Sequence, residues 1–88
     1  MSAAEPPSAR QLTVLSREGC ELCEQLLADL ADLAATLPLP AISVQDVDDD
    51  AQLARRYGLD IPVLLLDGVK VCQHRLDAAE LRRLLRHR

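Results

Sequence analysis

The stretch Arg17-Glu-Gly-Cys-Glu-Leu-Cys-Glu-Gln25 decides the fold, because it sets two cysteines between two patterns of different kind. Residues 12–15 before it, Leu-Thr-Val-Leu, predict a buried strand, and the leucine- and alanine-rich pattern after it predicts a helix. Cys20 and Cys23 are therefore expected where a strand ends and a helix begins. The first turn of a helix offers unpaired N–H groups and a partial positive charge, which stabilise the thiolate form of cysteine. The pair is thus predicted to be a redox motif.

Length and composition limit the class of protein. The 88 residues suffice for one domain and not for two. The net charge of −4 argues against phosphate binding, and one tyrosine without phenylalanine or tryptophan leaves almost nothing for base stacking. We therefore expect no nucleic acid as a partner. We expect no membrane either, because no segment approaches the roughly 20 apolar residues that span a bilayer.

Residues 1–10 are predicted to form a disordered tail, because they are small and polar, contain two prolines and lack the apolar run of a secretory signal. Three cysteines are an odd number and a poor disulfide framework, which fits a reducing compartment. These features predict a soluble, cytoplasmic protein, which we expect to be a monomer.

Hydrophobic periodicity and turn residues divide the rest of the chain into seven elements. In chain order we predict a strand at 11–16, a helix at 21–37, a strand at 41–47, a short helix at 51–57, strands at 63–66 and at 69–73 or 69–74, and a helix from 77 or 78 onward. Prolines 38 and 40 end the long helix, and glycine 58 ends the short one. Asp67-Gly68 predicts a two-residue hairpin turn, and Asp77-x-x-Glu80 resembles a capping box.

Apolar spacing predicts which side chains pack against the sheet. The positions expected to face it in the long helix are Leu22, Leu26, Leu30, Leu33 and Leu37. In the segment that follows, Ile42 and Val44, with Val47 as a less regular third position, alternate with polar residues, which is the pattern of a strand.

The order of elements predicts one topology. A strand–helix–strand opening requires a right-handed parallel crossover, and the closing hairpin adds an antiparallel pair. The expected fold is α/β, with a mixed four-stranded sheet and helices on both faces. The cysteines then lie at the carboxyl end of the first strand, where open α/β sheets hold their sites.

Two motifs carry a resemblance to a known superfamily: Cys20-Glu-Leu-Cys23 after a strand, and Asp60-Ile-Pro-Val63 at the start of another. With this element order, the sequence resembles the thioredoxin-like superfamily and, within it, small glutaredoxin-like proteins. The similarity extends over residues 12–85 and implies a glutaredoxin-like domain at 11–88 with the order β-α-β-α-β-β-α. It also implies that the first strand lies between the second and the third.

The resemblance has implications for substrate binding. It implies that the Ile61–Pro62 bond is cis and that these two residues meet an extended substrate beside the sulfurs. It implies glutathione as a candidate reductant, with no resident cofactor, and places Asp77 where glutaredoxins hold glutathione with an acidic residue. Arg75 is expected to meet either a substrate carboxylate or solvent. Residues 72–75, Cys-Gln-His-Arg, stand where glutaredoxins have Gly-Gly, so tight glutathione binding is not expected.

The leading hypothesis is a thiol–disulfide oxidoreductase that acts on a protein or low-molecular-weight disulfide. Cys20 is the expected nucleophile and Cys23 the resolving thiol. Three nearby glutamates, at positions 18, 21 and 24, are opposed by Arg17 alone. We therefore expect Cys20 to have a higher pKa than in efficient glutaredoxins and to react modestly with anionic glutathione.

Other interpretations remain open at the level of sequence. The cysteines could be free thiols packed as small apolar residues, or Cys20, Cys23, Cys72 and His74 could bind zinc. Family analogy adds an iron–sulfur cluster shared between two chains. Cys72 by itself is predicted to be a buried strand residue. From another class, the chain could be a non-catalytic thioredoxin-fold adaptor that binds a partner across the Pro62 surface.

The acidic run at 46–50 suggests a calcium loop, because Asp46, Asp48 and Asp50 match its first ligands. However, Ala51 stands where the loop needs glycine, and Tyr57 where it needs the closing glutamate. We therefore interpret the run as a solvated helix start.

Overall fold

The structure is a computed structural model that describes residues 10–86. Its elements are β1 (Gln11–Ser16), α1 (Glu21–Ala34), β2 (Ala41–Asp46), the 3-10 turn η2 (Val47–Asp49), α2 (Ala51–Tyr57), β3 (Val63–Leu66), β4 (Val69–Gln73) and α3 (Ala78–Arg86). The predicted disordered tail falls on residues 1–9, outside the described part. Arg10, which the prediction assigned to that tail, is described and forms an ion pair with Asp67 at 2.8 Å.

The four strands form one mixed sheet in the order β2-β1-β3-β4. β1 runs parallel to β2, with Val14 beside Val44, and antiparallel to β3, with Leu15 beside Val63. β3 and β4 form the closing hairpin. The predicted mixed sheet, with the first strand between the second and the third, is confirmed.

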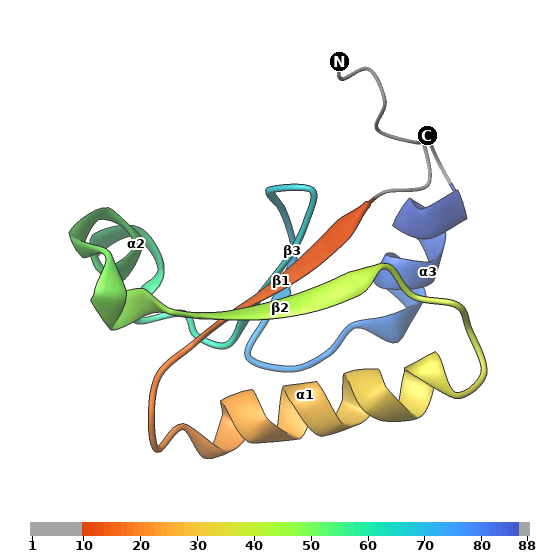
Figure 1. Ribbon diagram of the computed structural model, residues 1–88, viewed down its shortest axis with the longest axis horizontal. Helices are drawn as coiled ribbons and strands as arrows, with labels where there is room; N and C mark the ends of the chain where they lie inside the picture. The colour runs from red at the N-terminus through yellow and green to blue at the C-terminus, as the bar shows by residue number, and fades with distance from the viewer. Residues whose placement is uncertain (1–9, 87–88) are drawn as a thin grey trace.

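Each of the two central strands sends alternate side chains to opposite faces of the sheet. The larger core joins these strands to α1 and α3, and its fully buried members are Leu12, Val14, Leu26, Leu30, Leu64 and Leu81. The smaller core joins the intervening residues to α2, and contains Leu15, Val47 and Val63 with Leu53 and Tyr57 packed against them. Helices therefore cover both faces, as predicted. Figure 1 shows α2 and the start of α1 flanking the same end of the sheet, the carboxyl ends of β1 and β2.

Helix α1 begins at Glu21 as predicted, but it differs from the prediction in its last residue and in the burial of Leu22. It ends at Ala34, so Leu37 lies beyond the helix. The Leu37 N–H donates to Leu33 O at 2.9 Å. Leu22 is 43% exposed, and Cys23 is buried in its place at 1% exposure. The prediction for Leu22 is wrong because the buried stripe begins at Cys23, from which Leu26, Leu30 and Leu33 follow at helical spacing.

Strand β2 also differs, because it forms an edge of the sheet. It ends at Asp46, and Val47, which is fully buried, belongs to η2. Ile42 and Val44 lie on the α1 side of the sheet, beside Leu12 and Val14 in the register, but remain 39% and 55% exposed. An edge strand has a neighbour on one side only, which leaves its side chains partly uncovered.

The two predicted turn and cap motifs are present. Asp67 and Gly68 have φ of 52° and 87°, as a two-residue hairpin turn requires. Asp77 accepts a hydrogen bond from the Glu80 N–H at 3.0 Å, which caps α3. The Glu80 carboxylate pairs with Arg83 at 2.8 Å, so the motif caps through Asp77.

Candidate active site

Cys20 and Cys23 are joined in a disulfide at the start of α1, with 5.2 Å between their Cα atoms. Cys20 is the N-cap residue of the helix, and its Sγ accepts a hydrogen bond from the Cys23 N–H at 3.1 Å. Cys20 is partly exposed, whereas Cys23 is 1% exposed and packed under the helix. Cys20 is thus the cysteine of the pair that lies nearer the surface, and Cys23 is held inside.

A tight loop delivers Cys20 from β1 to this position. Gly19 has a φ of 78°, a conformation that side chains other than glycine rarely adopt. The Cys20 N–H donates to Arg17 O at 3.2 Å, which closes the turn. The loop is short because β1 ends at Ser16 and α1 begins at Glu21.

Arg17 ties this loop to the elements on either side of it. Its guanidinium forms two hydrogen bonds with the Asp48 carboxylate, at 2.8 and 3.0 Å, and donates to Gly58 O at 3.3 Å. The hydrogen bond from Arg17 lowers the pKa of Asp48, and the same bond raises the pKa of Arg17. Arg17 is therefore engaged by Asp48 and is not a free cation beside the sulfurs.

The proline segment lies beside this loop. Because the register pairs Leu15 with Val63, the chain that leaves β1 toward Cys20 runs next to the chain that enters β3 from Pro62. The Ile61–Pro62 peptide bond is cis. Pro62 is buried, its carbonyl accepts the His74 N–H at 2.7 Å, and Ile61 packs on the smaller core.

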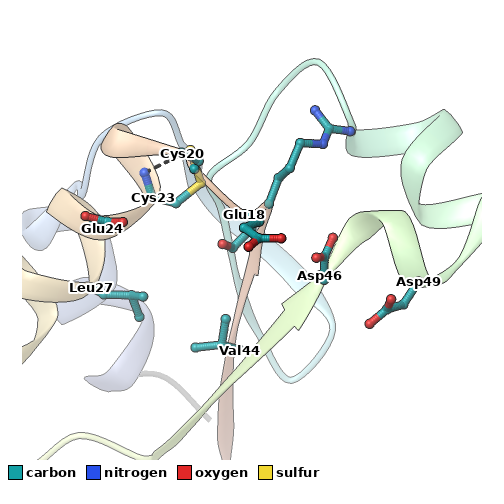
Figure 2. A pocket seen from close by; sticks show the side chains of 11 residues that line it. Glu18, Cys20, Cys23, Glu24, Leu27, Val44, Asp46 and Asp49 are labelled. Carbon is teal, nitrogen blue, oxygen red and sulfur yellow. Dashed lines mark hydrogen bonds between the residues drawn. A yellow bond between two sulfur atoms is a disulfide. The ribbon is translucent and has the colours of Figure 1, made fainter.

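A groove of about 540 Å³ opens on the other side of the disulfide, between the start of α1 and the end of β2. Both cysteines line it. Four carboxylates line it as well, Glu18, Glu24, Asp46 and Asp49, with Leu27 and Val44 as its aliphatic part. Figure 2 shows Leu27 and Val44 on the two walls of this groove, with Glu18 drawn between the disulfide and Asp46. We call it the α1–β2 groove.

Comparison with known proteins identifies the family. Residues 11–86 match the model of the glutaredoxin-like domain (DUF836). The chain belongs to this family. It is 35% identical over 81 residues to the uncharacterized protein Rv0508 of Mycobacterium tuberculosis and to Mb0520 of Mycobacterium bovis, an alignment that covers 81% of this chain and 82% of each relative.

Solved structures agree with this assignment. The glutaredoxin-like chain resembles protein Ne2328 from Nitrosomonas europaea with a TM-score of 0.78 and 29% identity, over 91% of this chain and 95% of that one. Protein XcR50 from X. campestris gives 0.65 and 35%, over 84% and 93%. Thioredoxin from Plasmodium falciparum, at 15% identity and a TM-score of 0.56 over 88% and 78%, shares the fold. The predicted thioredoxin-like fold is therefore confirmed.

The structure does not bring all the residues predicted for the site of this glutaredoxin-like domain into the α1–β2 groove. Ile61, Pro62, Arg75 and Asp77 do not line it. Arg75 and Asp77 are exposed, in the segment between β4 and α3, and Asp77 caps α3. The groove residues Leu27, Val44 and Asp49 were not predicted as site residues, and Asp46 was considered only as part of the acidic run, as a calcium ligand or as a solvated helix start.

Cys72 lies apart from the pair and is a free thiol of β4. It was predicted to be a buried strand residue; it does lie in a strand and packs against the larger core, but it is only partly buried. Burial raises the pKa of Cys72 above the usual range of a thiol. Its position beside Leu64 in the sheet register explains that burial.

Neither metal site considered from the sequence is assembled. Within residues 10–86, no three or more His, Cys, Asp or Glu side chains are grouped so that they could hold a metal ion. The acidic run serves other contacts: Asp46 accepts the Asp48 N–H at 2.8 Å, and Asp50 accepts the N–H groups of Gln52 and Leu53. The interpretation of this run as a helix start is confirmed by Asp50, which caps α2.

None of the helices in the described part of the chain is long and apolar enough to cross a membrane.

Proposed function

We propose that this glutaredoxin-like protein is a cytoplasmic thiol–disulfide oxidoreductase that reduces disulfides through Cys20 and Cys23. One observation carries the proposal: the two cysteines of a bonded pair differ in exposure, and the Sγ of the partly exposed one, Cys20, accepts the Cys23 N–H at the start of a helix. A structural disulfide needs no such asymmetry. A catalytic pair needs one sulfur that reaches the substrate and a second that is held next to the first.

The reaction follows from this arrangement. In the reduced protein the Cys20 thiolate attacks a substrate disulfide, which forms a Cys20–substrate bond and releases one substrate thiolate that takes up a proton. Cys23 then loses its proton and attacks Cys20 Sγ, which restores the Cys20–Cys23 bond and releases the second substrate thiol. One disulfide is reduced to two thiols for each protein dithiol oxidised. A thiol reductant, for which glutathione is our candidate, returns the protein to the dithiol.

The local charges favour a moderate nucleophile. The Cys23 N–H and the N-terminal end of α1 stabilise a thiolate at Cys20, an effect on the order of 0.3–1 kcal/mol for a helix terminus. Opposing this, Glu18 and Glu24 line the groove beside it, and Arg17 is bound to Asp48. We therefore keep the expectation that the pKa of Cys20 is higher than in efficient glutaredoxins.

The substrate chain is proposed to lie against Ile61 and Pro62. The pairing of Leu15 with Val63 sets this segment beside the loop that carries Cys20. Ile61 makes no backbone hydrogen bond within the described part of the chain, so its N–H and C=O are free to pair with an extended substrate. Arg75 and Asp77, both exposed, complete the proposed contact surface on the α3 side.

Single-turnover kinetics test the function. The protein, reduced and freed of reductant, is mixed with bis(2-hydroxyethyl) disulfide, an uncharged substrate, and the released thiol is followed with time. We expect rapid release by the wild type and loss of at least about a hundredfold in Cys20→Ser, because serine cannot form the mixed disulfide. Cys72→Ser is the matched control and is expected to react within about twofold of the wild type, because burial disfavours the Cys72 thiolate.

Equal rates in the wild type and Cys20→Ser would overturn the proposal. The chain would then be a non-catalytic adaptor with this fold, whose cysteines play no part in its function.

A further inference from the structure

We propose that the α1–β2 groove selects the substrate: it takes a polypeptide disulfide with a cationic side chain close to the reacting cysteine. This inference rests on the proposed function and names the class of disulfide that the site prefers. The groove starts at the disulfide itself, since both Cys20 and Cys23 line it. A chain bonded to Cys20 therefore has the groove as an adjacent place to lie.

The charges of the groove determine the sign of its occupant. Four of its lining residues are carboxylates, Glu18, Glu24, Asp46 and Asp49, and its one cation is Arg17. Arg17 is bound to Asp48 by two hydrogen bonds and its charge also acts on Asp46, which leaves Glu18, Glu24 and Asp49 without a cationic partner in the groove. Among residues 10–86, none of the four forms a salt bridge. Like charges in a groove repel an anionic chain and attract a cationic one, which affects both the rate of encounter and the selection of partners.

The aliphatic part of the groove gives the occupant a second feature. Val44 is 55% exposed on the α1 side of edge strand β2, opposite Leu27 of α1 (Figure 2). An apolar residue between the substrate cysteine and its cation would cover Val44. The carboxylates Asp46 and Asp49 lie at the β2 and η2 end of the groove and would then face the cation.

This contact lies on the other side of the disulfide from the proline segment. Ile61 and Pro62 are on the β3 side of β1, whereas the groove is on its β2 side. The two surfaces therefore contribute separately to substrate binding. Backbone pairing at Ile61 does not depend on the charge of the substrate's side chains, whereas the groove supplies the preference for a cation.

The experiment uses three matched substrates. They are the disulfide-linked homodimers of acetyl-Cys-Leu-Lys-amide, acetyl-Cys-Leu-Gln-amide and acetyl-Cys-Leu-Glu-amide, each reduced by the full-length reduced protein under single-turnover conditions. The readout is the rate of reduction of the lysine peptide divided by that of the glutamate peptide. This ratio is then divided by the same ratio measured with dithiothreitol as the reducing agent in place of the protein. Changes in the pKa of Cys20 affect both rates alike and cancel in this ratio.

Glu18→Gln/Asp49→Asn removes two groove carboxylates, one of which is expected to face the cation, and spares Asp46, which accepts the Asp48 N–H. Its control, Asp29→Asn/Asp32→Asn, removes the same charge from α1 outside the groove. We expect a wild-type ratio of about 10 or more at low ionic strength, reduced at least about threefold in the groove variant and unchanged in the control. The ratio should also fall as salt is added.

The outcomes separate the two proposals. A wild-type ratio within about twofold of unity, or an equal fall of the ratio in both double variants, would contradict the proposal that the groove selects the substrate. If the glutamine peptide is still reduced, the proposed oxidoreductase function is not contradicted. If the wild type does not reduce the glutamine peptide, the proposed function fails and this inference fails with it.

Discussion

Cys20 and Cys72 are the same side chain in two surroundings. Cys20 stands before helix α1, partly exposed, and its Sγ accepts an N–H from the first turn. Cys72 lies in β4, beside Leu64 in the register, and packs against the larger core, where burial raises its pKa. The contrast teaches that two cysteines of one chain can differ in reactivity because of where each lies in the fold. A thiol at the start of a helix is available as a nucleophile, whereas a thiol packed against the core is not.

The largest effect is expected when Cys23, the resolving cysteine of the pair, is replaced. Cys23→Ser leaves Cys20 able to attack but removes the thiol that releases the second product. We expect turnover of bis(2-hydroxyethyl) disulfide with a dithiol reductant to fall at least about tenfold, whereas Cys72→Ser stays within about twofold. The measurement is steady-state thiol release. A Cys72→Ser loss as large as that of Cys23→Ser would make Cys72 the resolving thiol and contradict the comparison.

Alkylation sharpens the comparison between the two environments. In the reduced protein we expect iodoacetamide to modify Cys20 at least about tenfold faster than Cys72 at pH 7.5, because alkylation needs the thiolate. Since burial raises the pKa of Cys72, its rate should still be climbing above pH 9.0. Peptide masses after timed quenching give both rates. Faster modification of Cys72 than of Cys20 at neutral pH would reverse the assignment.

A matched pair of glycines isolates the Cys20 loop. Gly19 and Gly68 both have positive φ, 78° and 87°, and a Cβ at either would meet no atom within 4 Å. We expect Gly19→Ala and Gly68→Ala each to lower the free energy of unfolding by about 1 kcal/mol, from backbone strain alone. Only Gly19→Ala should also slow disulfide reduction, by about threefold or more, because it shifts the residue that precedes Cys20.

Urea unfolding measures the first effect of each glycine variant and thiol release the second. Equal reduction rates in the two variants would show that the Cys20 loop tolerates displacement.

The smallest expected effect concerns the ion pair beside the loop. The hydrogen bond from Arg17 lowers the pKa of Asp48, so this pair adds stability above the unfolded-state value of 3.8, and that stability is lost as the pH falls through the lower folded pKa. Arg17→Gln should therefore be less stable than the wild type at pH 7, with the difference vanishing at acid pH. Urea unfolding at several pH values tests this. A difference that persists undiminished well below pH 3.8 would show that Arg17 acts through Gly58 O instead.

Local sequence predicted most of the fold because each element carries its own signal. The bounds of β1, α2 and β3 follow from short apolar runs and the flanking Asp50 and Gly58. The error at Leu22 has a local cause: once Cys23 is taken as a redox residue, it is not counted as the first member of the buried stripe. The exposure of Ile42 and Val44 has a distant cause, because whether a strand lies at an edge depends on the whole sheet order.

Only the local part of the site could be predicted from the sequence, because the rest depends on contacts between distant segments. The Cys20–Cys23 pair is local, and a helix after a strand was enough to place it. The α1–β2 groove joins residues 18–27 to residues 44–49, and Arg17 binds Asp48 across a separation of 31 residues. Neither segment alone predicts that it lies beside the other. The acidic run was also already explained as a helix start, so no further role was sought for it.

The central claim is that Cys20 Sγ is the attacking atom. Its most direct test is to treat reduced Cys23→Ser with bis(2-hydroxyethyl) disulfide and map the trapped mixed disulfide by mass spectrometry of non-reduced peptides. The account predicts one hydroxyethylthio group per chain, on Cys20. An adduct on Cys72 with Cys20 unmodified, or no adduct on either residue, would contradict it.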